Sequence, residues 1–343
     1  NSPPVYNGPT RVRLGLAQSK NVMSVRLIRQ VGLSNAIDYL TRFGFKKSEL
    51  PRNDTLALGS ASLTPLEVAV AFSTFSNGGF KVEPFFIERI EDAYGSLLYQ
   101  AKPKQACLNC EKLIEQQADD ADYVLANQQT GEEFGQCPIA AYSKDQLAER
   151  IITEQNAFLM CQMLTSTIWG GGSWRHKTGW NGTGWRAARA LKRRDIGGKT
   201  GTTNSAKDAW FSGFNPNVAA TSWIGFDDHR RELGRVARNA NLGKEQVSGG
   251  EAGAKTAQPA WIDFMAIALA NEPKMKDKIP SGIVQVRIDR KTGLLTNKSA
   301  HTTRFEYFEK GSEPTEYVSN QQNNAVFDQL DNDSDDESID NLF

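Results

Sequence analysis

Histidine is scarce in this 343-residue chain, which has only His176, His229 and His301. So few, widely spaced histidines argue against a Ser-His-Asp catalytic triad. The sequence also lacks the motifs H-E-x-x-H, G-x-S-x-G and G-x-G-x-x-G, which mark zinc proteases, α/β-hydrolases and dinucleotide-binding folds. Gly198-Lys199-Thr200 looks like the end of a phosphate-binding loop, but Arg193 stands where that motif needs its first glycine. Any catalysis must therefore use other groups.

Net charge and long apolar segments are absent as well. Forty Lys and Arg balance forty Asp and Glu, whereas proteins that bind nucleic acid are normally basic, so we expect no nucleic-acid partner. No apolar run is long enough to cross a bilayer. The chain begins Asn-Ser-Pro-Pro, with neither an initiator Met nor a charged-then-apolar leader. We interpret this start as a cut end and expect further sequence upstream.

The balanced total hides two regions of opposite charge. Residues 311–343 contain nine acidic residues and no Lys or Arg, so the rest of the chain has an excess of nine basic residues. A uniformly acidic segment with few apolar residues buries too little surface to offset the entropy lost on ordering. We expect residues 306–343 to be a solvated, disordered tail, with a docking segment for a basic partner as the alternative.

Cysteine is also rare, with four residues in the chain. Cys161 lies in a helix-like apolar run, where a lone cysteine is usually a buried thiol. The polar stretch 101–147 contains the other three, Cys107, Cys110 and Cys137. One interpretation is a zinc site, for which a fourth ligand is not evident. The other is a disulfide that closes an inserted loop. We favour the disulfide, which implies an oxidising compartment, and its pairing stays open.

Helix signals dominate the first hundred residues. Residues 11–31 have apolar side chains at helical spacing, Gly32 is expected to stop this helix, and Ser34 is expected to cap the next one. Thr64-Pro65-Leu66-Glu67 has the composition of a capping box followed by a helix. We therefore expect three helices before the first strand signals.

Strand signals become frequent later in the chain. The remaining predicted elements, in order, are strands 85–91 and 96–100, helix 151–168, strands 208–214 and 218–226, helix 259–270 and strand 283–288. Helices come first and antiparallel strands later. This order predicts a mixed α/β (α+β) fold with a central antiparallel sheet flanked by helices, rather than βαβ repeats.

Two short polar motifs carry the candidate chemistry. Lys199-Thr200-Gly201-Thr202 precedes a predicted hairpin, so it can lie on an edge strand, where a fixed cation and two hydroxyls could bind a carboxylate. The glycines at 197, 198 and 201 would let a substrate approach the backbone. Ser19-Lys20-Asn21 precedes a helix, where Ser19 would ordinarily be an N-cap. Alternatively, Ser19 relays a proton and Asn21 holds a carbonyl group.

The same two motifs occur in this order in serine transpeptidases and class A β-lactamases, which share S-x-x-K, S-x-N and K-T-G. The chain resembles the class A high-molecular-mass penicillin-binding proteins, and most of all their type 1A members, in residues 11–26, 58–72 and 197–214. The stretches 101–147 and beyond about 300 match poorly. The resemblance implies the penicillin-binding and β-lactamase-like transpeptidase fold.

The resemblance also implies a peptidoglycan D,D-transpeptidase that works through an acyl-serine intermediate, requires no metal or other cofactor and is acylated by β-lactams. Ser19 would pass a proton to the leaving D-Ala nitrogen, and Asn21 would hold the amide carbonyl of the acyl chain. Lys199 would add positive potential and fix Ser19. These three are the expected catalytic residues.

The K-T-G strand is expected to bind the substrate. Thr200 and Thr202 would bind its terminal carboxylate, with Gly201 between them, and the backbone N–H of Thr202 would form half of the oxyanion hole. A basic, tryptophan-rich loop at 169–194 leads to this strand, and we expect it to border the groove for peptide or glycan through Arg193 and Arg194.

The nucleophile motif of the resembled family is missing, because no serine in the chain has a lysine three residues later. In that family the motif precedes S-x-N, so we expect it upstream of Asn1, with a glycosyltransferase domain and a membrane anchor. The expected location is then the periplasmic face of the bacterial inner membrane. The expected partners are peptidoglycan stem peptides and glycan, β-lactams, and the upstream part of the same protein.

These expectations divide the chain into four parts: a helical part with S-x-N at 1–100, a cysteine-containing insert at 101–147, a sheet part with K-T-G at 148–305, and the acidic tail at 306–343. Two other functions stay open. One is a D,D-carboxypeptidase or β-lactamase of the same fold, and the other is a non-catalytic glycan-binding module.

Overall fold

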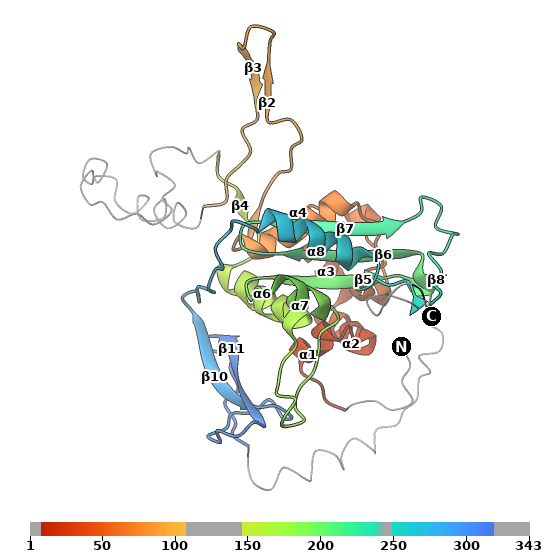
Figure 1. Ribbon diagram of the computed structural model, residues 1–343. Coiled ribbons are helices and arrows are strands. Elements are labelled where there is room, and N and C mark those ends of the chain that lie inside the picture. Colours follow the sequence, from red (N-terminus) through yellow and green to blue (C-terminus); the bar gives the residue numbers. More distant parts are fainter. Residues whose placement is uncertain (1–7, 108–145, 239–240, 242–248, 319–343) are drawn as a thin grey trace, which may run out of the picture.

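The computed structural model describes residues 8–107, 146–238, 241 and 249–318 (Figure 1). The helices are α1 (Val12–Ala17), α2 (Asn21–Val31), α3 (Leu33–Arg42), α4 (Pro65–Ser76), α6 (Glu154–Trp169), α7 (Trp185–Leu191) and α8 (Ala257–Ala268), with short 3₁₀ turns at Lys47–Glu49, Asp54–Leu58 and Asn204–Ala206. The strands are β1 (Phe80–Lys81), β2 (Arg89–Glu91), β3 (Leu97–Gln100), β4 (Glu149–Arg150), β5 (Gly197–Thr202), β6 (Asp208–Phe214), β7 (Ala219–Gly225), β8 (Arg235–Val236), β9 (Gly249–Gly250), β10 (Ile283–Asp289) and β11 (Thr303–Glu309).

The centre of the fold is an antiparallel sheet in the order β5-β6-β7. Helices α4 and α8 pack along β6 and β7, and α6 packs along β5 (Figure 1). Phe211 of β6 meets Trp261 of α8 with ring centroids 4.8 Å apart, in a core that includes Ile168 and Met265. Such burial of large apolar side chains is the main favourable term in folding. The mixed fold with a central antiparallel sheet flanked by helices is confirmed.

The predicted helix at 11–31 is wrong in one respect, because the chain breaks it into α1 and α2. The break lies at residues 18–20, and α2 packs back on α1 so closely that a Cβ on Gly15 would lie 2.1 Å from Met23 Cε. Gly32, with a φ of +89°, ends α2 as predicted. It is also the N-cap of α3, so Ser34 lies inside that helix and does not cap it.

The capping box at the start of α4 is confirmed. Thr64 N donates to Glu67 Oε2 at 2.8 Å, and Glu67 N donates to Thr64 Oγ1 at 3.2 Å. Pro65 occupies the first turn, where its missing N–H costs nothing. Four adjacent residues thus define this helix start without tertiary contacts, which is why the sequence alone predicts it.

Two antiparallel hairpins extend from this body. The β2–β3 hairpin projects away from the sheet (Figure 1), with the turn closed by Asp92, whose Oδ1 accepts from Tyr94 N and Ser96 N at 2.8 Å. The β10–β11 hairpin packs on α6. Glu306 sits inside β11 and is buried, so the disordered tail does not begin at residue 306 as predicted. Residues 319–343 lie outside the described part.

The cysteines behave as a disulfide-bonded residue and a free thiol. Cys107 is disulfide-bonded, which rules it out as a zinc ligand; Cys110 and Cys137 lie outside the described residues, so the pairing stays open. Cys161 is a free thiol whose Sγ donates to Phe75 O at 3.2 Å, and burial raises its pKa to about 12. The raised pKa makes this thiol unreactive, and the side chain is half-buried rather than fully buried as predicted. Across the described ranges, the helices are all too short or too polar to span a membrane.

Candidate active site

Ser19 lies at the break between α1 and α2 in a left-handed conformation, with a φ of +56°. A non-glycine residue pays roughly 1–2 kcal/mol for this conformation, and such strain is often kept where a side chain must be aimed. The N-cap of α2 is Lys20, with no side-chain capping bond. The interpretation of Ser19 as an N-cap is therefore wrong, because its Oγ instead accepts a hydrogen bond from Lys199 Nζ at 2.8 Å.

Lys199 lies on β5, opposite Ser212 of β6. Its Nζ donates to Ser19 Oγ at 2.8 Å and to Thr200 O at 2.9 Å. Within the described ranges, no carboxylate forms an ion pair with Lys199, and burial lowers its pKa to about 8. The structure thus brings together two predicted site residues that are 180 positions apart in the sequence.

The backbone of β5 presents polar groups at its outer edge, where it has no partner among the described strands. Thr203 N donates to Asp208 O at 3.3 Å, so this pair is hydrogen-bonded. Because such pairs alternate along an antiparallel ladder, the N–H and C=O groups of Thr200 and Thr202 point away from β6. The bond from Lys199 to the carbonyl of Thr200 agrees with this register. The N–H of Thr202 is therefore available at the edge next to Lys199.

Sequence reasoning missed Thr183, which links α1 to β5. Thr200 Oγ1 donates to Thr183 Oγ1 at 2.9 Å, and Thr183 N donates to Ala17 O at 3.0 Å. No pattern in the sequence marks Thr183. In the structure, the residue before it is held close to α6, since a Cβ on Gly182 would lie 2.0 Å from Thr167 O. The loop thus passes tightly over α6 to reach the site.

A second missed contact comes from the backbone before α8. Gly253 N donates to Thr202 Oγ1 at 2.9 Å. Because this bond uses a lone pair of the hydroxyl, the O–H of Thr202 is left free to donate to another group. No side-chain pattern in the sequence could have indicated a backbone donor.

Asn21 is the first residue of α2 and is partly buried. Within the part of the chain that the structure describes, its side-chain amide makes no hydrogen bond, and it does not join the Ser19–Lys199 contact. Its role in holding a substrate carbonyl stays a prediction.

The glycines of the K-T-G strand serve internal packing, and their role in admitting a substrate backbone stays a prediction. A Cβ on Gly197 would lie 2.9 Å from Phe214 Cζ, and one on Gly198 would lie 2.8 Å from Ser212 O. A Cβ on Gly201 would lie 3.0 Å from Trp210 Cβ of the neighbouring strand. The protein itself fills these spaces.

Arg193 does not form the expected groove border, and the role of Arg194 there stays a prediction. Arg193 is 6% exposed and pairs with Asp195 through two hydrogen bonds, of 3.1 and 2.7 Å. Arg194 stacks over the ring of Trp169, 3.8 Å from its centroid. One arginine is therefore structural and the other belongs to an aromatic contact.

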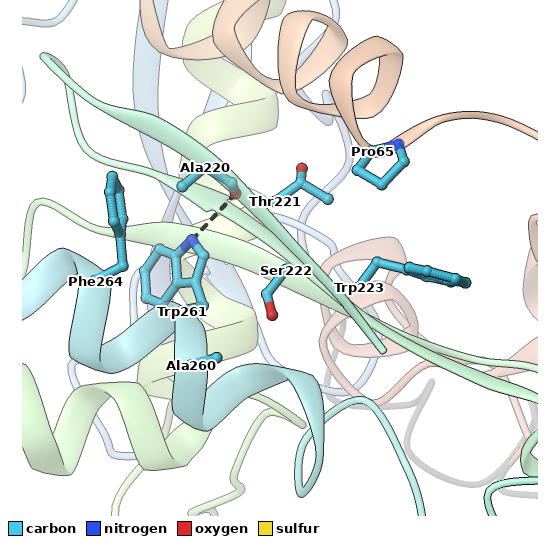
Figure 2. A pocket seen from close by; sticks show the side chains of 8 residues that line it. All are labelled: Pro65, Ala220, Thr221, Ser222, Trp223, Ala260, Trp261 and Phe264. Carbon is cyan, nitrogen blue, oxygen red and sulfur yellow. Dashed lines mark hydrogen bonds between the residues drawn. The ribbon is translucent and has the colours of Figure 1, made fainter. Parts of the chain in front are cut away.

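The cavity drawn in Figure 2 lies at the opposite edge of the sheet, between β7, the start of α4 and the middle of α8. Its lining residues are Pro65, Ala220, Thr221, Ser222, Trp223, Ala260, Trp261 and Phe264. None of the predicted site residues is among them. The candidate site is therefore the outer edge of β5 with Ser19, and not this cavity.

Comparison with known proteins gives a consistent result. Residues 1–227 match the penicillin binding protein transpeptidase domain, and residues 279–322 match the penicillin-binding protein 1A C-terminal domain. The second match corrects the expectation that the chain beyond about 300 is unlike the family.

Individual relatives extend this match over nearly the whole chain. Penicillin-binding protein 1A of Vibrio cholerae is 52% identical over 95% of this chain and 37% of its own length, and that of Escherichia coli is 43% identical over 96% and 40%. The crystal structure of penicillin-binding protein 1A from Haemophilus influenzae has a TM-score of 0.73 and 42% identity, over 92% of this chain and 42% of that chain. This chain spans about two fifths of the length of these relatives. It belongs to the penicillin-binding protein transpeptidase family.

Proposed function

We propose that this chain carries the S-x-N and K-T-G part of a peptidoglycan D,D-transpeptidase within a longer, bifunctional cell-wall synthase. The observation that supports this most is the 2.8 Å contact between Lys199 Nζ and Ser19 Oγ. It joins the two family motifs at the edge of β5, and the Lys199 cation there has no carboxylate partner among the described residues. A cation left unpaired in this way is available to an anionic substrate.

The first step is binding of the substrate carboxylate along β5. Thr202 donates its free O–H to the carboxylate, and Lys199 attracts it. Two opposite charges 4 Å apart interact by about 4 kcal/mol at an effective dielectric constant of 20. The hydroxyl of Thr200 is used in the bond to Thr183, so Thr202 is the better donor of the two threonines.

The second step is acyl transfer. A serine nucleophile on a segment outside this chain attacks the carbonyl of the penultimate D-Ala, and the N–H of Thr202 stabilises the oxyanion. The lysine of the same S-x-x-K motif takes the proton of this serine. Ser19, whose Oγ accepts from Lys199, passes its own hydroxyl proton to the departing D-Ala nitrogen and receives the nucleophile's proton in its place. The acyl group then passes to the amine of another stem peptide or to water. No metal or cofactor enters these steps.

Location and partners follow from this activity. Peptidoglycan lies outside the cytoplasm, and the disulfide at Cys107 fits an oxidising compartment. We place the protein at the periplasmic face of the inner membrane, anchored by a segment outside this chain. Its partners are stem peptides, glycan, β-lactams and the upstream part of the same protein, with Asn21 holding the acyl chain.

The proposal also divides the chain into the helical part, the insert, the sheet part and the tail, with boundaries at residues 100 and 147. The sheet part, expected to end at 305, continues through β11.

A D,D-carboxypeptidase or β-lactamase of the same fold is the second candidate function, and a non-catalytic glycan-binding module is the third. The identities of 52% and 43% to two penicillin-binding proteins 1A favour the transpeptidase. The test is labelling with a fluorescent penicillin of the protein that carries this chain and the nucleophile segment. A stable acyl-enzyme supports a transpeptidase, hydrolysis within seconds supports a β-lactamase, and absence of labelling supports the non-catalytic module.

A further inference from the structure

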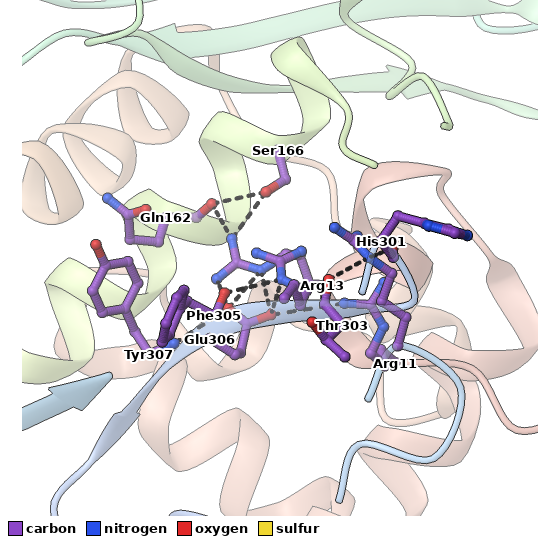
Figure 3. A network of polar contacts seen from close by, with 11 residues as sticks. Arg11, Arg13, Gln162, Ser166, His301, Thr303, Phe305, Glu306 and Tyr307 are labelled. Carbon is purple, nitrogen blue, oxygen red and sulfur yellow. Dashed lines mark hydrogen bonds and ion pairs between the residues drawn. The ribbon is translucent and has the colours of Figure 1, made fainter. Parts of the chain in front are cut away.

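A buried polar cluster joins α1, α6 and β11 outside the candidate site (Figure 3). Arg13 Nε donates to both carboxylate oxygens of Glu306, at 3.0 and 3.1 Å. Arg13 Nη1 donates to Ser166 Oγ at 2.9 Å and to Gln162 O on α6. Arg13 is 7% exposed and Glu306 is 8% exposed. One guanidinium therefore fastens α1 to both the helix and the C-terminal hairpin.

Glu306 is the shared counter-ion of this cluster. Its Oε2 also lies 3.3 Å from Arg304 Nε and 3.9 Å from Arg11 Nη1. Burial lowers the pKa of Arg304 to about 10, and the charge of Glu306 opposes that shift. No second carboxylate among the described residues forms an ion pair with Arg11 or Arg13. Without the charge of Glu306, Arg13 would be a buried cation with no counter-ion, which is strongly unfavourable.

Helix α6 connects this cluster to the candidate site through adjacent residues. Ser166 accepts the hydrogen bond from Arg13 of α1, and Thr167 Oγ1 donates to Gly198 O of β5. Ser19 follows the end of α1, and Lys199 follows Gly198. The separation of Ser19 from Lys199 is therefore set by how α1 and β5 are each held on α6.

We propose that Glu306 is a positioning residue for Ser19. By holding Arg13 against α6, it keeps Ser19 Oγ within hydrogen-bond distance of Lys199 Nζ. This gives a role in the chemistry to the region at 279–322, which lies outside the transpeptidase-domain match. The inference rests on the proposed function of Ser19 and Lys199.

The test is Glu306→Gln in the protein that carries the nucleophile segment, followed by stopped-flow acylation with a fluorescent penicillin. The maximal acylation rate per folded molecule should fall by about 10²-fold, the cost of a misplacement of about 1 Å in a catalytic group. The half-saturating penicillin concentration should stay unchanged, since β5 is intact. Glu309→Gln is the matched control, because Glu309 is exposed on the same strand, and it should leave both values unchanged.

A purely structural role would lower the melting temperature of Glu306→Gln and leave its acylation rate per folded molecule as in the wild type, which would overturn the inference. If this variant does not fold, Ser166→Ala decides, because it removes one bond of Arg13 and keeps the ion pair. It should slow maximal acylation about fivefold, as expected for one hydrogen bond, and an unchanged rate would again overturn the inference. Lys199→Ala is measured in parallel, since normal acylation of that variant would instead refute the proposed function.

Discussion

Arg193 and Lys199 are two cations six residues apart that the fold treats in opposite ways. Arg193 donates to Asp195 and to the backbone carbonyls of Leu269, Glu272 and Pro273. Lys199 has a hydroxyl and a carbonyl as its partners, and burial lowers its pKa to about 8. The first is a compensated charge and the second is not.

The comparison shows how a structural cation can be told from a functional one within the same basic segment. A buried ion needs a counter-ion and satisfied hydrogen bonds to be tolerated, and Arg193 has both. Lys199 has no counter-ion in the described ranges, so its partial burial is a cost that the fold bears. We infer that the site tolerates this cost because the substrate supplies the missing negative charge. Removing Lys199 should therefore affect activity, and removing Arg193 should affect stability.

The largest expected effect is that of Lys199→Ala in the protein with its nucleophile segment. Penicillin acylation should fall by about 10²–10³-fold, as for loss of one preorganised electrostatic group in an active site. The melting temperature should not fall, because a poorly compensated charge is removed. Stopped-flow acylation and thermal unfolding measure the two effects, with the exposed Lys291→Ala as the matched control.

Arg193→Ala should have the converse effect. It leaves Asp195 buried without its partner, which should lower the free energy of unfolding by about 3–5 kcal/mol. Acylation per folded molecule should stay within twofold of wild type. Urea unfolding checks the first value, and Arg194→Ala, which removes a surface contact with Trp169, should cost only about 0.5–1 kcal/mol. Equal losses of stability in the two variants would break the comparison.

The pH dependence of acylation should sharpen the comparison between Lys199 and Arg193. Since burial lowers the pKa of Lys199 to about 8, the folded protein loses the cation as pH rises through that value. Acylation should fall about tenfold for each pH unit above the pKa if the cation is required. Between about pH 8 and the pKa of the unfolded state, the folded state binds fewer protons, so the cost of burying the Lys199 cation is progressively relieved and the free energy of unfolding rises with pH. A rate that instead increases through pH 8 would identify neutral Lys199 as the active form.

The smallest expected effect is that of Thr183→Val. This change removes the acceptor for Thr200 Oγ1 and leaves the backbone bond to Ala17 intact. Acylation should slow about fivefold, the equivalent of about 1 kcal/mol for one hydrogen bond. The matched control is Thr55→Val, a half-buried threonine far from the site whose hydroxyl bonds only Asn53 and Ser60 beside it. An unaffected rate in Thr183→Val would remove Thr183 from the site.

The predictable parts of this molecule are those that local sequence determines. The capping box at Thr64 and Glu67 uses residues three apart, and the strands predicted at 208–214 and 218–226 are found as the adjacent antiparallel strands β6 and β7. The motif Lys199-Thr200-Gly201 was correctly placed on an edge strand by its position before a hairpin.

The unpredicted parts depend on contacts between distant segments. Periodicity alone continues the helix through Ser19, because the bond to Lys199 that fixes its left-handed turn is invisible in the local sequence. Charge alone assigned Glu306 to an acidic tail, because its partner Arg13 lies 293 positions earlier. Arg193 was assigned to a groove for the same reason, since the carbonyls that satisfy it come from residues 269–273.

The most direct test of the contrast between the two cations is the penicillin acylation rate per folded molecule, measured side by side for Lys199→Ala and Arg193→Ala. The account predicts a loss of at least about 10²-fold in the first variant and a rate within twofold of wild type in the second. Near-normal acylation of Lys199→Ala, or an equal loss in both variants, would contradict it.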